Sequence, residues 1–415
     1  MCVSLKVQEI LVLVEMYSIL LHPRYCKSLT NSKQNAMFNK IRKFTGIKFF
    51  VYISAFLIIT GCQKEIPKDP STLFPYIEAV DKTKTQSKEI DLSKVFVNSR
   101  IIPLETNQNS IIGGFSTKTI KNNSHFYVQS TNDVVIFNDK GEFTSRLSKV
   151  GSGPEEYPYL LDFDVVDSLG EIWISSNDGI MRYDRSSLRF KGKIDIPFAA
   201  TKFKYINDST IIAKTPEDIT YCIFDIEGKT RKSFYEKNIA NSAIKPLGFI
   251  RIGNLIVSQL EDTNSAICFD VETDEFSIRH LIAQNDGISS PETNSEYLEK
   301  YGYFDMSKHV DEDFICISAL RAVKDFVLVT LSYPDKSRKL AVADKKSFRL
   351  FPYFPSDENT LKYNLSTVED LHPLTLNTLI TGESDDSFLF LLMSDNDIES
   401  NPQILEVFDI NIPVE

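Results

Sequence analysis

The chain has 415 residues, 42% of them hydrophobic and 25% charged, with a formal net charge of −11, a composition typical of a globular protein. Without residues 1–61, which end with the targeting segment described next, it holds 38 basic and 55 acidic residues, a formal net charge of −17. A charge of this sign argues against non-specific nucleic-acid binding and against a basic patch for anionic lipid, so we expect no nucleic-acid partner.

The chain from Met37 onward begins with a targeting signal. A basic region ending at Lys48 precedes an apolar core, Phe49–Ile59, and the small residues before Cys62 follow. This order is the layout of a secretory signal peptide, and the apolar run is shorter than the ~20 residues of a membrane span. Its end resembles the lipobox of bacterial lipoproteins, which implies that residues 37–61 are removed and that Cys62 is acylated. The alternative is a chance cysteine beside an ordinary cleavage site.

One segment precedes this signal and another follows it. Residues 1–36 carry an apolar run of their own, which bacterial signals do not normally have, so we expect translation to start at Met37 and these residues to be an extension of the gene model. Residues 62–96 are polar and contain three prolines. Such a composition predicts a tether between the lipidated Cys62 and a domain that spans residues 97–415.

Within this domain a pair of strands recurs. A short apolar strand is followed by a second strand that ends in Asn or Asp and a polar turn, and the spacing of tens of residues indicates a structural repeat. Turns such as Asn138–Gly141 contain residues that tolerate positive φ, which predicts β-hairpins. The copies end at Asn138, Asp184, Asp225, Asp270, Asp344 and Asp409.

The number of copies and the ends of the domain predict the architecture. Five copies are followed by a fourth strand, whereas the sixth ends near Glu415, and the apolar segment Ser99–Leu104 could supply its missing strand. We therefore predict an all-β fold, a six-bladed β-propeller with four-stranded blades and a last blade closed by an N-terminal strand, which removes open edges. A β-sandwich would also contain many short strands, but not a consistent turn after the third strand.

Two units are longer than the others. The first carries residues 284–313, in which Ser290 followed by proline predicts a helix start, and the second carries residues 352–377. Exposed aromatic rings on such extensions could stack on sugars, whereas the alternative is that the extensions only cover a blade. The candidate ligand-binding residues here are Tyr297, Tyr301 and Tyr303.

The loop after the first hairpin carries a family resemblance. Residues 149–166 and the hairpin before them resemble the six-bladed β-propeller lipoproteins of Bacteroidota, which are related in fold to NHL-repeat propellers. The family's Gly-x-Gly-Pro-x-Glu-Tyr loop is matched here, although the family usually has Gly at the position of Glu155; the matching residues are Gly151, Gly153, Pro154, Glu156 and Tyr157. The resemblance covers residues 97–412 and implies a lipid-anchored envelope protein, on the periplasmic or surface face of the outer membrane, without an established reaction.

The same loop allows two interpretations. Glu156 and Tyr157 could present a carboxylate and a ring to a ligand, next to glycines that permit close backbone approach. In the interpretation that we favour, Tyr157 packs between two blades and Glu156 bonds exposed backbone amides. We therefore keep Glu156 and Tyr157 as possible ligand-binding residues.

Known catalytic motifs are not found in the sequence. There is no HExxH, GxSxG or CxxC, and the Gly-Ser-Gly-Pro segment leads into a strand, so it cannot hold phosphate at a helix N-terminus. The sparse cysteines lack metal spacing, and Cys222 and Cys268 are expected to be buried. We therefore assign no catalytic residue, metal ligand or cofactor and expect a binding module for a glycan or an envelope protein. The alternative is a metal-dependent hydrolase or lyase at the propeller channel, for which the candidates are Glu156, Asp162, Asp164, His309 and His372.

Overall fold

The computed structural model describes residues 96–113, 118–177, 179–215, 220–235, 248–260, 263–281, 287–323, 326–334, 338–343, 348–353, 360–361, 374–375, 380–384, 386–392 and 400–410. All of them belong to one unit, Pro67–Glu415. The expected signal peptide, Cys62 and the tether as far as residue 95 lie outside the described residues, as do residues 1–36 and His372. No helix among the described residues is long and apolar enough to cross a membrane.

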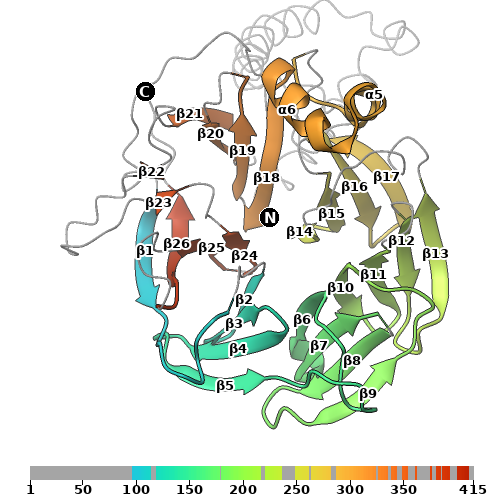
Figure 1. Ribbon diagram of the computed structural model, residues 1–415, viewed down its shortest axis with the longest axis vertical. Helices are drawn as coiled ribbons and strands as arrows, with labels where there is room; N and C mark the ends of the chain where they lie inside the picture. Colours follow the sequence, from blue (N-terminus) through green and yellow to red (C-terminus); the bar gives the residue numbers. More distant parts are fainter. Residues whose placement is uncertain are drawn as a thin grey trace, which may run out of the picture. The chain divides into compact units, whose positions relative to one another are not determined.

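The fold is an all-β propeller with four-stranded antiparallel blades (Figure 1). The described strands form six four-stranded sheets, and five of these sheets use four strands that follow one another in the chain. These strands are β2 (Thr119–Asn122), β3 (His125–Ser130), β4 (Asp133–Asn138) and β5 (Phe143–Leu147); β6 (Asp162–Val166), β7 (Glu171–Ser176), β8 (Gly179–Asp184) and β9 (Phe190–Ile194); β10 (Lys202–Asn207), β11 (Thr210–Lys214), β12 (Thr220–Phe224) and β13 (Thr230–Tyr235); β14 (Ile250–Ile252), β15 (Leu255–Gln259), β16 (Ser265–Asp270) and β17 (Glu275–His280); and β18 (Cys316–Val323), β19 (Phe326–Ser332), β20 (Arg338–Ala343) and β21 (Phe348–Tyr353).

The remaining four-stranded sheet joins the two ends of the described chain. Its strands are β24 (Ile380–Gly382), β25 (Phe388–Leu392), β26 (Gln403–Ile410) and, at the edge, β1 (Phe96–Pro103). β1 pairs antiparallel with β26, from Phe96 opposite Ile410 to Pro103 opposite Gln403. The expected N-terminal strand therefore completes the last sheet, and it begins at Phe96 rather than at Ser99.

The recurring Asn or Asp organises the turn after the third strand. Asn138 Oδ1 accepts hydrogen bonds from the amides two and four residues further on, at 2.9 and 3.0 Å. Asp225 makes the same pair of bonds, at 3.1 and 2.9 Å. Gly141 in the first of these turns has φ +82°, and a Cβ there would lie 2.1 Å from the carbonyl oxygen of Pro103 at the end of β1. The repeated motif thus shapes the hairpin and lets it approach the neighbouring sheet closely.

The apolar core lies between neighbouring sheets. One cluster joins Leu147 of β5 to Phe163 of β6, and the next joins Trp173 of β7 to Phe203 of β10, with all four side chains buried. The sheet of β6 to β9 therefore contributes both faces to the core, and successive residues of β6 and β7 are buried. Stability in such an arrangement comes from the contacts of each sheet with its two neighbours.

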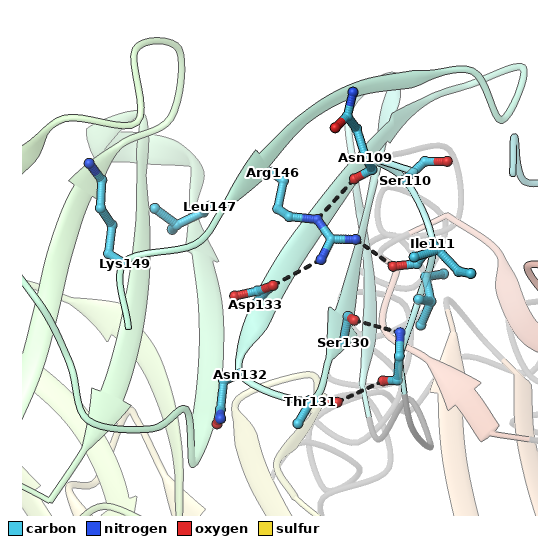
Figure 2. Close-up of polar contacts among 12 residues, drawn as sticks. Asn109, Ser110, Ile111, Ser130, Thr131, Asn132, Asp133, Arg146, Leu147 and Lys149 are labelled. Carbon is cyan, nitrogen blue, oxygen red and sulfur yellow. Dashed lines mark hydrogen bonds and ion pairs between the residues drawn. The ribbon is translucent and has the colours of Figure 1, made fainter. Parts of the chain in front are cut away.

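A loop of residues 104–113 connects β1 to β2 and crosses between the last and the first sheet. Arg146 of β5 fastens this loop from the side of the first sheet, as Figure 2 shows. Its guanidinium donates to the carbonyl oxygens of Asn109, at 3.0 Å, and Ile111, and forms an ion pair with Asp133 at 2.9 Å.

Asn401, just before β26, fastens the same loop from the side of the last sheet. Its side chain is 8% exposed, and its Oδ1 accepts from the amide of Ile112 at 2.8 Å. Its Nδ2 donates to the carbonyl oxygens of Glu105 and Ser110, at 2.7 and 3.0 Å. One buried amide side chain therefore connects residues almost 300 positions apart in the chain, where their separations are 289, 291 and 296.

The two long units differ in how much of them is described. The predicted helix start is confirmed: α5 (Pro291–Tyr301) is capped by Ser290 Oγ, which accepts from the amide of Thr293 at 3.2 Å. A second helix, α6 (Tyr303–Asp313), was not predicted. Of the extension at residues 352–377, the structure describes residues 352–353 at the end of β21 and the short strands β22 (Thr360–Leu361) and β23 (Leu374–Thr375), which pair with each other. One turn of 3-10 helix, Asp167–Leu169, joins β6 to β7.

Candidate functional site

Each sheet turns one edge strand to the inner side of the propeller: β2, β6, β10, β14, β18 and, in the last sheet, β24. β6 contacts both β2 and β10, β2 contacts β24, and β14 contacts β18 (Figure 1). Two of these strands carry charged residues two positions apart: Asp162 and Asp164 on β6, and Lys202 and Lys204 on β10. Because side chains alternate along a strand, each pair lies on one face of its strand.

These charges form a network of ion pairs across four sheets. The Lys204 Nζ lies 2.8 Å from Asp164 Oδ1 and 2.9 Å from Glu383 Oε2. The Lys118 Nζ lies 3.3 Å from both Asp162 Oδ1 and Glu383 Oε1. The side chains of Asp162 and Asp164 are 0% and 2% exposed, so the network is largely removed from solvent.

Glu383 reaches the network because the backbone of the last sheet bonds directly to that of the first. Its amide donates to the Thr119 carbonyl oxygen at 2.7 Å, and its own carbonyl oxygen accepts from the Lys121 amide at 2.8 Å. A Cβ at Gly382, just before it, would lie only 2.8 Å from the same Thr119 oxygen. A residue without a side chain at position 382 therefore permits this approach, which places the Glu383 carboxylate between two lysines.

Glu383, Lys118 and Lys204 are all charged at neutral pH. Burial raises the pKa of Glu383, but Lys118 and Lys204 more than offset this and lower it to about 2. Burial lowers the pKa of Lys204, yet Asp164 and Glu383 raise it above its ordinary value, and Lys118 is raised in the same way by Asp162 and Glu383. A carboxylate held in this manner is a fixed charge rather than a proton acceptor.

Asp162 and Asp164 also bond the backbone of the adjacent sheet. Asp162 Oδ2 accepts from the Phe203 amide at 3.0 Å, and Asp164 Oδ2 accepts from the Tyr205 amide at 3.1 Å. Both carboxylates, proposed above as candidate metal ligands, thus hold β6 to β10. In the described part of the chain, no group of three or more His, Cys, Asp or Glu side chains is arranged to hold a metal ion.

A cavity of about 340 Å³ adjoins this network. Residues in or next to the inner strands of all six sheets line it, which places it on the propeller channel. Its size is at the lower end of the range for small-molecule sites. Its ionisable lining residues are Lys121, Lys204, Arg251, Arg321 and Glu383.

The residues of the family loop lie at a junction between two sheets. Tyr157 is fully buried, and its hydroxyl donates to the Asn132 carbonyl oxygen at 2.9 Å. Its ring meets that of Tyr183 edge to face with centroids 6.2 Å apart, and burial raises its pKa. Glu156 Oε2 accepts from the amide of Gly153 at 2.9 Å. These contacts are those of the favoured structural interpretation, and neither residue lines the channel cavity.

The predicted aromatic residues of the long unit lie on α5 and α6. The rings of Tyr297 and Tyr301 have centroids 5.5 Å apart, and Tyr301 stacks on His309 at 3.9 Å. The Tyr297 hydroxyl donates to Asp313, which raises the pKa of Tyr297 to about 12. Tyr303 lies in α6, but its side chain is outside the described residues. The structure therefore brings together two of the three tyrosines, and both are absent from the cavity lining.

The charged residues of the network and of the cavity lining were missed from the sequence, apart from Asp162 and Asp164 of the network. Arg321 lies in β18, whose other residues are apolar or small, and a single arginine in such a strand was the available signal. Lys202 and Lys204 repeat the spacing of Asp162 and Asp164 in the following sheet, and this match in spacing could also have been noticed.

Comparisons with known proteins agree with the architecture. A family model described as Domain of unknown function (DUF4934) matches residues 74–405. No curated protein matches the sequence. A Bacteroides fragilis structure, described provisionally as an exported protein, is 17% identical with a TM-score of 0.59, over 78% of this chain and 98% of that one. A Bacteroides vulgatus member of the DUF4221 family is 13% identical with a TM-score of 0.44, over 76% and 98%. Likeness at this level of identity concerns the fold alone.

Proposed function

The chain belongs to the family described as Domain of unknown function (DUF4934), and from this premise we propose that it is an exported cell-envelope lipoprotein whose propeller binds a ligand without catalysis. In this proposal the six four-stranded sheets are the six blades of one ring, similar to NHL-repeat propellers, and Cys62 carries the lipid that anchors the protein. The provisional description of the Bacteroides fragilis structure as exported is in keeping with such a location.

The observation that carries the binding role is the channel cavity. Residues in or next to the inner strands of all six sheets line it, so a ligand there could contact every sheet. The adjoining carboxylates are paired with lysines, and Glu383 with a pKa of about 2 is a poor general base at neutral pH. Fixed, paired charges around a preformed cavity suit recognition better than proton transfer. Glycan or envelope-protein contacts at Tyr297, Tyr301 and Tyr303, or at Glu156 and Tyr157, remain part of the proposal.

The binding role is tested by filling the cavity. Ile250, a half-buried lining residue on β14, is replaced by Trp, and Ile278→Trp on the outer strand β17 of the same sheet is the matched control. Small molecules of an envelope extract are passed over the immobilised mature protein, and the retained species are identified by mass spectrometry. We expect a species retained unchanged by the wild type and the control but lost with Ile250→Trp. Equal retention by all three proteins, or conversion of the species to another mass, would contradict the proposal.

The anchor is tested separately. Cys62→Ala should abolish labelling by a radioactive fatty acid and move the protein from the membrane fraction to the soluble fraction. Labelling that persists in this variant would show that another residue is lipidated. The two experiments are independent, because the cavity lies on the channel and Cys62 precedes the domain.

A further inference from the structure

The charge around the channel cavity is opposite in sign to that of the whole chain. Among the described residues, five ionisable side chains line it; four of these are cationic, and Glu383 is the one anion. The chain as a whole has a formal net charge of −11. A cationic cavity in an acidic protein is therefore a local property, and its field would be focused by the surrounding low-dielectric walls.

Two of these cations already have partners in the protein. Lys204 is paired with Asp164 and Glu383, as described above. Lys121 is paired with Glu406, a fully buried carboxylate that also bonds Arg100 at 2.8 Å and the Ser387 hydroxyl at 2.7 Å. These charges are compensated within the protein and contribute little net positive potential.

Arg251 and Arg321 are different. Within the described part of the chain, their recorded side-chain bonds go to backbone carbonyl oxygens: Arg251 Nε donates to Gly253 at 3.2 Å, and Arg321 Nη1 donates to Leu320 at 2.6 Å. Glu383 acts on Arg321 only through longer-range attraction. Two guanidinium groups at one cavity are thus left without a carboxylate among the described residues.

Arg321 has the stronger requirement for a partner. Its Nε is buried and has no hydrogen-bond acceptor among the described residues. A buried donor left unpaired destabilises the folded protein, and more so when the group is charged, so an acceptor that enters the cavity would remove this penalty. Arg251 is exposed, and it could meet a ligand at the same cavity from the solvent side.

The other lining residues indicate the rest of the ligand. Ile120, Val165, Phe249, Ile250 and Val323 supply an apolar wall beside the two arginines. We propose that the cavity binds a small organic anion, whose carboxylate or phosphate group is held by Arg321 and Arg251 and whose body lies against this wall. The planar guanidinium fork matches both groups in a bidentate manner, which an ammonium cannot do. This inference rests on the proposed binding function and names the chemical class of its ligand.

A divalent cation fits the same cavity poorly. In the described part of the lining, the one carboxylate, Glu383, is already held by two lysines, and hard cations require several oxygen ligands. The two unpaired guanidinium groups would repel the cation as well. The observations thus favour an anion over a metal ion.

Calorimetric titration of the mature protein tests the inference. The probes are galacturonate for a carboxylate, glucose 6-phosphate for a phosphate ester, inorganic phosphate for the bare anion, and neutral glucose as the reference. We expect at least one of the organic anions to bind, glucose to bind at least about tenfold more weakly, and the affinity to fall as salt is raised. The two organic anions distinguish a carboxylate from a phosphate ligand.

Variants connect this binding to the arginines. Arg321→Gln and Arg251→Gln should each weaken the anion by about tenfold or more, whereas Arg279→Gln on the outer strand β17 should leave it unchanged. Arg251 is exposed, so its variant keeps the test valid if Arg321→Gln unfolds, which thermal unfolding would reveal. Failure of all three anions to bind, or equal affinity for glucose with unchanged binding in both variants, would refute the inference. The extract experiment with Ile250→Trp could still succeed in that case, and the proposed binding function would then stand alone.

Discussion

Replacing Asn401 by Ala should destabilise the propeller where its last sheet meets its first. The substitution removes three hydrogen bonds of 2.7–3.0 Å to the loop of residues 104–113, at a side chain that is 8% exposed. Each lost bond costs about 1 kcal/mol, and more where the partner stays dry, so we expect a loss of about 3 kcal/mol in the free energy of unfolding. Because the bonds join residues about 290 positions apart, no local refolding of the turn can replace them.

The assay is urea unfolding of the mature protein, followed by tryptophan and tyrosine fluorescence, with comparison of midpoints at constant slope. The matched control is Asn254→Ala, which removes an exposed hydrogen bond to Glu272 at 2.7 Å and should cost less than about 0.5 kcal/mol. If Asn401→Ala costs no more than the control, the loop does not fasten the two sheets, and our account of closure is wrong. A changed slope would indicate that unfolding is no longer a single transition.

Three further predictions follow from single residues. Gly141→Ala should lower the free energy of unfolding by at least about 2 kcal/mol in the same assay, because a Cβ would collide with a backbone oxygen. The control Gly170→Ala, at φ +64° with open space around it, should lower it by about 1 kcal/mol, and equal losses would contradict this prediction. Tyr157→Ala should cost about 3–5 kcal/mol as a fully buried ring and hydroxyl are lost, and a small loss with altered ligand retention would favour the binding interpretation instead. Burial and Lys202 lower the pKa of Lys214 to about 8 from 10.5, so at this residue the unfolded chain binds more protons between these values. Lys214→Met should therefore be more stable than the wild type at pH 7, and this advantage should shrink as the pH rises from 8 to 10.5; a difference that stays constant with pH would refute the reasoning.

The repeat could be predicted from the sequence because it depends on hydrogen bonds between residues that are close together in the chain. An Asn or Asp that bonds the amides two and four residues on, as at Asn138 and Asp225, leaves the same mark wherever the hairpin recurs. The cap at Ser290 is local in the same sense. In contrast, α6 follows Gly302 and has no side-chain cap, so no capping residue in the sequence indicates where it starts.

The site could not be predicted in the same way, because its partners meet only through the tertiary structure. Lys204 and Glu383 are 179 positions apart, and each is an ordinary polar residue in its own segment. Glu383 owes its place to backbone bonds between β24 and β2, which no local pattern shows. The sequence shows Arg321 as one cation among apolar or small residues, but only the structure shows that it lines a cavity.

The pairing of β1 with β26 has a consequence for biosynthesis. Arg100 and its partner Glu406 are 306 positions apart, and a chain that emerges at ~10 residues per second needs about half a minute to supply the second after the first. During this time β1 has no strand to pair with, and the last sheet cannot form before residue 410 has been made. We therefore expect proteases to cut this strand more readily in a chain that stalls near its end than in a finished chain, where β26 pairs with it. Protease resistance of β1 would then report that synthesis has been completed.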